Sequence, residues 1–149
     1  MTVRLSTGIH NAMLDGGTGK GVKGSLAAGF MAILTGSQPA TADAAATGTL
    51  LGTVSVNGAG TGTTFDAAVA GVLSKAAAEV WRFTGLAAGI AGWFRCYPAG
   101  DTITNISATA TRIDGAIGSS GADVNLTNLN IAVSQVNTVD TFTITLPTA

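Results

Sequence analysis

The chain has 149 residues, a length that suits one domain. Only 10% of the residues are charged, and seven Lys and Arg against eight Asp and Glu give a formal net charge of −1. This balance excludes a basic nucleic-acid-binding protein and a polybasic membrane-surface protein, because both need clustered cations. No apolar run approaches the roughly 20 residues that cross a bilayer, so the sequence predicts neither nucleic acid nor a membrane as a partner.

The N-terminal segment 3–14 predicts a short helix. Its apolar residues recur at i, i+4 and i+8 and form one stripe: Leu5, Ile9 and Met13. A helix of under about 12 residues is marginal in water, so we expect this stripe to pack against another subunit. The glycine-rich segment 16–24 would let it reach a neighbour. We therefore divide the chain into an N-terminal helical arm with its loop, residues 1–24, and a domain over residues 25–149.

The rest of the chain alternates strand-like segments with turns. Alternating or continuous apolar patterns predict strands over residues 26–34, 49–56, 79–83, 90–97, 129–133 and 142–146. Helical spacing predicts one or two turns over 40–46 and a short helix over 65–78, and small residues predict a loop over 114–123. Twenty-one glycines and many threonines disfavour an all-helical fold. The pattern predicts a mainly-β chain with a single β-sandwich or jelly-roll-like domain.

The last predicted strand carries the clearest alternation. Threonines separate its three apolar residues, which are Phe142, Ile144 and Leu146. We predict that the apolar set faces the core and that the threonines face outward. A slip of one residue would exchange these two faces, so the register of this strand is strongly specified.

Candidate chemical motifs are weak. Residues 19–24, GKGVKG, match the spacing of a dinucleotide-binding glycine loop, but no buried strand precedes them as that site requires. His10 is the sole histidine and Cys96 the sole cysteine, so neither a metal cluster nor a disulfide framework is predicted. Cys96 is expected to be a core residue. We predict no catalytic, cofactor-binding or metal-binding residues, and therefore no enzymatic activity.

One group of aromatic and arginine residues stands out in the second half of the chain: Trp81, Arg82, Trp93, Arg95 and Tyr97. Aromatic and arginine side chains are typical anchors of protein interfaces. The same residues are equally typical of a sandwich core with cations on its outer face. Both interpretations stay open, and the group joins the N-terminal stripe as a candidate interface. Trp81, Trp93 and Tyr97 also suggest a stacking platform for a sugar.

Several longer strings carry a resemblance to a known class of proteins. They are TGSQPATADAAATGTLL (35–51), GLAAGIAGWFR (85–95), RIDGAIGSSGADVNL (112–126) and FTITLP (142–147). In this order they resemble small virion structural proteins of tailed bacteriophages. The resemblance implies a β-sandwich without enzymatic activity that assembles on the viral particle. Where it would place a Gly-Asp-type turn before the last strand, this chain has residues 135–138, QVNT.

The resemblance suggests a specific role in the virion. A capsid decoration or cement protein would bind the major capsid protein and neighbouring copies of itself, as a homo-oligomer. The first alternative is a tail or head-to-tail connector component. The second is a carbohydrate-binding or receptor-binding module, which exposed tryptophans would favour.

Overall fold

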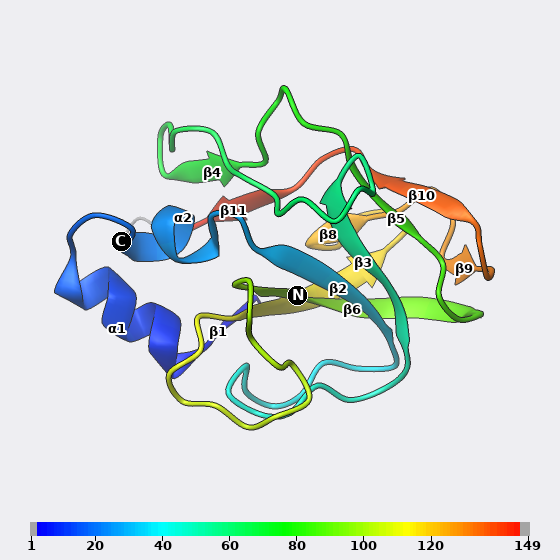
Figure 1. Cartoon of the computed structure of the whole chain (residues 1–149), viewed down its shortest axis with the longest axis horizontal. Helices are drawn as coiled ribbons and strands as arrows, with labels where there is room; N and C mark the ends of the chain where they lie inside the picture. Colours follow the sequence, from blue (N-terminus) through cyan, green and yellow to red (C-terminus); the bar gives the residue numbers. More distant parts are fainter. Residues whose placement is uncertain (1–2, 147–149) are drawn as a thin grey trace.

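The computed structural model describes residues 3–146 and confirms the predicted mainly-β class (Figure 1). Within these residues the chain forms two short helices and eleven strands. In chain order they are β1 (Arg4–Leu5), α1 (Thr7–Asp15), α2 (Gly21–Leu26), β2 (Phe30–Thr35), β3 (Leu50–Val56), β4 (Val72–Ser74), β5 (Trp81–Thr84), β6 (Gly89–Tyr97), β7 (Ile113–Gly118), β8 (Val124–Asn125), β9 (Asn130–Ile131), β10 (Val136–Val139) and β11 (Thr143–Thr145).

One large sheet organises the molecule. Its strands run in the order β1-β7-β6-β2-β3-β5-β10, each antiparallel to its neighbours. Two short strands branch from this path, β8 beside β7 and β9 beside β6. A separate pair, β4 and β11, forms a second small sheet. The main core fills the space between the small sheet and the large one.

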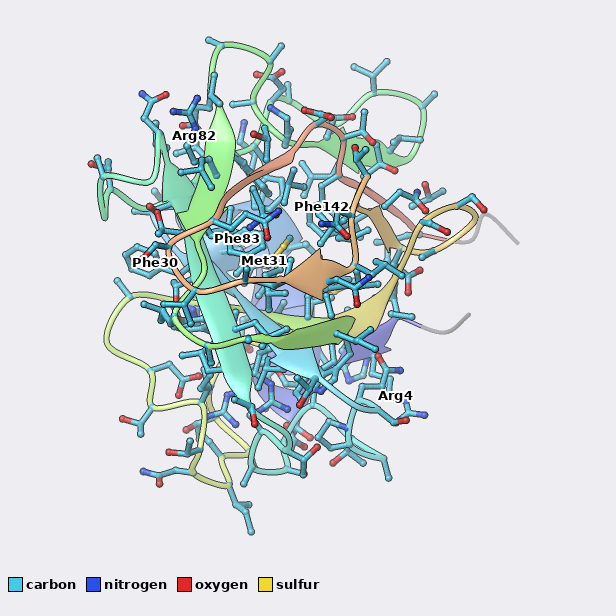
Figure 2. The ribbon with its side chains drawn as sticks, turned by 90° about the vertical axis from the view of Figure 1, so that its right-hand side faces the viewer. Arg4, Phe30, Met31, Arg82, Phe83 and Phe142 are labelled. Atoms are coloured by element: carbon cyan, nitrogen blue, oxygen red, sulfur yellow. The ribbon has the colours of Figure 1, made fainter. Side chains whose placement is uncertain are left out.

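The small sheet is attached to the large sheet by aromatic packing around Phe142. The ring of Phe142 meets the Phe94 ring edge-on at 5.3 Å and the Trp81 ring at 5.9 Å. Edge-on contacts of this kind stabilise aromatic pairs beyond the area they bury. Figure 2 shows Phe142 in the interior together with Met31 and Phe83, with Arg4 near the periphery. The predicted core orientation is confirmed for Phe142 and Ile144, and the predicted outward orientation is confirmed for the exposed Thr141, Thr143 and Thr145.

Leu146 departs from that prediction, because it is 39% exposed. Strand β11 ends at Thr145, so the pairing that holds the alternation in place stops one residue earlier. The segment 135–138 also differs from a turn: Val136–Val139 is strand β10, which pairs with β5 at the edge of the large sheet. The last strand therefore has no hairpin partner immediately before it in the chain.

Other local predictions need correction. The segment 65–78 is not a helix, since its apolar spacing belongs to an irregular hairpin that turns at Ala70 and Gly71, both with positive φ. Residues 40–44 form bends and turns in place of the predicted helical turns, and residues 45–46 are irregular. The first half of the expected loop over 114–123 is strand β7, where Gly115 lets the Phe94 ring lie against the backbone.

The N-terminal segment is built into the same core rather than extended as an arm. The helix begins at Thr7, because Ser6 caps it by accepting a hydrogen bond from the Ile9 amide at 3.2 Å. Leu5 lies before the helix in β1, opposite Ile113 of β7. The segment expected to be a flexible loop contains α2, which crosses the proposed boundary at residue 24.

Candidate interaction surface

The aromatic–arginine group lies mainly inside the molecule. Trp81, Trp93 and Arg95 are each buried, so their interpretation as interface anchors is wrong. The indole of Trp81 donates to the Glu79 carboxylate at 2.8 Å, and that of Trp93 donates to a backbone carbonyl at 3.1 Å. These two rings cannot form a surface platform for a sugar. Trp93 is buried because β6 is a central strand covered on both faces, whereas Trp81 faces the main core from β5.

The other members of the group are half-buried. Tyr97 packs its ring beside Phe30, with the centroids 6.0 Å apart. Burial raises the pKa of the Tyr97 phenol, against a hydrogen bond with Thr53. Arg82 lies against the turn at Gly58 and is partly exposed. Both remain at the surface without forming a cluster with the buried tryptophans.

Arg95 is buried because two loops cover the outer face of the large sheet. Its guanidinium makes a two-pronged ion pair with Asp114 on the neighbouring strand, with N···O distances of 2.8 and 2.7 Å. A third nitrogen donates to the carbonyls of Ala44 and Ile103, one from each loop. Burial raises the pKa of Asp114, and the guanidinium of Arg95 opposes that rise. Arg95 therefore holds both loops onto the sheet.

A second buried arginine, Arg112, makes the contacts that hold the loop over 98–112 together. Arg112 is buried and pairs with Asp101 through two contacts of 2.6 and 2.7 Å. It also donates to the carbonyls of Thr102 and Asn105 at 3.1 and 2.9 Å. Sequence reasoning missed both ion pairs, because their partners come together only through strand pairing and loop folding. Two-pronged arginine–carboxylate pairs fix geometry as well as charge, so these loops are held in one conformation.

The single cysteine and the single histidine of the chain lie on different elements, β6 and α1. Cys96 is buried on the opposite face of β6 from Arg95, and burial raises the pKa of its thiol well above the ordinary value. His10 is exposed on α1. Across the described residues no three His, Cys, Asp or Glu side chains are grouped as a metal site would need. None of the helices in this range is long and apolar enough to span a membrane.

The surface carries an apolar region that the sequence did not single out. Four side chains more than half exposed lie on adjoining segments: Leu86, Ile90, Val133 and Val136. Residues 83–94 and 124–139, which supply them, contain no charged residue and no histidine. We call this region the charge-free end. In Figure 1 it lies at the right, with β9, β10 and the start of β6, and Figure 2 is viewed from that side.

Backbone contacts hold the charge-free end together. The Gly85 amide donates to Gln135, and the Ser134 amide donates back to Gly85, both at 2.8 Å. A side chain at Gly85 would collide with the Ala132 carbonyl, so glycine is required for this approach. Ile90 is paired with Asn130 across β6 and β9. The four exposed residues are therefore fixed relative to one another.

The opposite end of the molecule is hollowed. A groove of about 420 Å³ lies between α2 and the small sheet, and Lys20 and Lys23 are the charged residues among those of 3–146 that line it. Its apolar lining includes Met13, the last member of the N-terminal stripe. We call this feature the lysine groove. Of that stripe, Ile9 is fully buried within its own chain and Leu5 half-buried, so only Met13 is available at the surface.

Comparison with known proteins was made for family, sequence and structure. No family model, no curated protein and no solved structure matches the chain. The fold defines a mainly antiparallel β module whose covering loops are held by the ion pairs of Arg95 and Arg112. Its surface has two distinct apolar regions, the charge-free end and the lysine groove.

Proposed function

We propose that this chain is a structural component of a tailed-phage virion, and most specifically a capsid decoration or cement protein. It would bind the major capsid protein and neighbouring copies of itself, and it would perform no catalysis. The charge-free end is the observation that carries the proposal. Depletion of charged residues distinguishes the core of protein interfaces from the rest of a surface. Contiguous exposed apolar residues mark interaction sites.

Two further observations support this assignment. The string GLAAGIAGWFR (85–95), one of those that resemble phage virion proteins, contains both Leu86 and Ile90 of the charge-free end. The buried pairs of Arg95 with Asp114 and of Arg112 with Asp101 hold the covering loops in place. A rigid module loses little conformational freedom on docking, which favours repeated attachment to a lattice.

The test measures incorporation into particles. Wild-type protein and the double variant Leu86→Glu/Ile90→Glu are each supplied to particles grown without the chain, and bound copies are counted by quantitative mass spectrometry. Ile106→Glu is the matched control, since Ile106 is an exposed apolar residue outside the charge-free end. We expect wild type and control to bind and the double variant to remain free, with all three equally folded by circular dichroism.

Copy number separates the two virion roles. Hundreds of copies per particle support attachment to the capsid lattice, whereas a few dozen or fewer identify the tail or connector alternative. Absence of wild-type protein from particles contradicts the proposal. Normal incorporation of the double variant contradicts the role of the charge-free end.

A further inference from the structure

We propose that the lysine groove binds a second copy of this chain across a two-fold axis, and that Leu14 of each copy occupies the groove of the other. This inference deepens the proposed function, on which it rests, by naming the contact between neighbouring copies. Three properties of the groove end favour this occupant: the apolar lining of the groove, the exposure of Leu14, and the positions of the charged residues Asp15, Lys20 and Lys23.

The groove has the lining and size for an apolar side chain. Leu73 and Ile144 of the small sheet contribute to it and are nearly fully buried. Val22 and Leu146 also line it and are partly exposed. A volume of about 420 Å³ falls in the range of pockets that bind small ligands. Because the described residues of its lining include two lysines and no acid, the groove favours an apolar occupant that has a carboxylate beside it.

The chain itself presents such a group at the end of α1. Leu14 is 86% exposed and is followed directly by Asp15. Met13 lines the groove, and the next residue of a helix lies about 100° further around its axis. Leu14 therefore stands beside its own groove without entering it. Burying a leucine side chain stabilises by roughly 1.5–3 kcal/mol, a gain that this residue does not obtain within one copy.

The charges around Leu14 are free to rearrange. Asp15 meets Lys20 at 3.7 Å, but both side chains are largely in water, where such a pair contributes little. Lys23 forms no salt bridge with any residue in the described range 3–146. A two-fold axis near Met13 would bring Asp15 of each copy toward Lys23 of the other. Such a contact uses the same residues twice and closes on itself, as symmetric dimers do.

The test measures self-association of the full chain by sedimentation velocity over a concentration series. We expect a wild-type dimer, and we expect Leu14→Asp to weaken it by about a hundredfold, because the substitution acts twice in each dimer. Ile106→Asp is the matched control and should dimerise as wild type. A wild-type chain that stays monomeric, or a Leu14→Asp variant that dimerises normally, overturns the inference.

A charge exchange tests the orientation. Asp15→Lys and Lys23→Asp should each weaken the dimer by about tenfold. The double variant carrying both changes should dimerise more tightly than either single variant, because the reciprocal pair forms again with its signs reversed. A double variant no tighter than the singles rejects the two-fold arrangement.

Failure of the groove contact and failure of the virion role give different experimental results. If wild-type protein is found on particles but Leu14→Asp leaves its self-association unchanged, the groove contact is wrong and the virion role stands. If the predicted dimer forms but the chain is absent from particles, the virion role is wrong and the groove contact stands.

Discussion

The two ends of the molecule expose apolar residues in different ways. At the charge-free end, Ile90 and Val136 lie on strands of the large sheet and Leu86 and Val133 on the connections beside them, in segments without a charged residue. At the other end, the small sheet and α2 enclose a groove that two lysines line. A partner of the first surface would be selected by shape and apolar area alone. At the second surface the two lysines would add a sign of charge to that selection.

The largest expected loss of stability comes from the core residue Phe142, and it should affect the groove end before the charge-free end. Phe142→Ala should destabilise the chain by about 3–5 kcal/mol, because it empties the aromatic contact between the small and large sheets. Hydrogen exchange should rise first over β4 and β11, which line the groove, and later at β5 and β6. Thr143→Ala is the control and should change stability by less than about 0.5 kcal/mol. Uniform loss of protection would show that the two ends do not depend on separate sheets.

The second largest loss of stability should come from Arg95, and it should leave the binding properties of both ends unchanged. Arg95→Met leaves Asp114 buried without its main ion-pair partner, and we expect a loss of about 3 kcal/mol in urea unfolding. Hydrogen exchange should increase over the covering loops at 36–49 and 98–112. Self-association and particle binding, measured where the variant is folded, should match wild type. Loss of either would show that the loops take part in binding.

A smaller effect depends on pH. Burial tends to raise the pKa of Glu79, but hydrogen bonds from Thr64 and Trp81 outweigh it and lower the pKa. The carboxylate therefore contributes stability above its unfolded pKa of about 4.5, and this is lost as the pH falls through the folded value.

We expect Glu79→Gln to be less stable than wild type by about 1–2 kcal/mol at pH 7. Thermal unfolding should show the difference shrinking on acidification below the unfolded pKa. A difference that is constant from pH 7 to pH 3 would contradict this account. Asp140→Asn, at an exposed carboxylate, is the control and should change stability at pH 7 by less than about 0.5 kcal/mol.

The smallest effect should act on α1 at the groove end and on the end of the 98–112 loop, which Ser6 also contacts. Ser6→Ala removes the cap of α1 and a hydroxyl that also donates to the Ala110 carbonyl at 2.7 Å. We expect a loss of about 1 kcal/mol and faster exchange in α1, with a weaker dimer and unchanged particle binding. His10→Ala, at an exposed position of α1, keeps the Ser6 cap and serves as the control for substitution in this helix. A Ser6→Ala dimer as tight as wild type would show that α1 does not position Leu14.

Elements that depend on local sequence patterns were easier to predict than elements that depend on pairing between residues far apart in the chain. The orientation of residues 142–145 was predictable because the two faces of this segment differ in polarity at every residue, whereas Leu146 lies beyond the end of β11 and is partly exposed. A helix was wrongly predicted over residues 65–78 because Phe65, Val69 and Leu73 happen to recur at helical spacing. The segment is an irregular hairpin, and Gly71 is the one local sign of its turn. Strand β10 was missed because Val136–Val139 carries polar residues in its middle and pairs with a strand more than fifty residues earlier.

The interaction surfaces show the same limit. The absence of charge over 83–94 and 124–139 is visible in the sequence, but only the pairing of β6 with β9 and of β5 with β10 brings the two segments together. The burial of Arg95 was not predictable, because Asp114 and the covering loops reach it through the fold. The helical stripe correctly identified Ile9 as apolar and buried, but the partner it packs against is its own chain.

The most direct test of the central claim is a reconstruction of the intact particle in which this chain is located. The account predicts many copies on the outer lattice, with Leu86, Ile90, Val133 and Val136 covered by the major capsid protein. Particles without the chain, or copies whose charge-free end faces solvent, would contradict it.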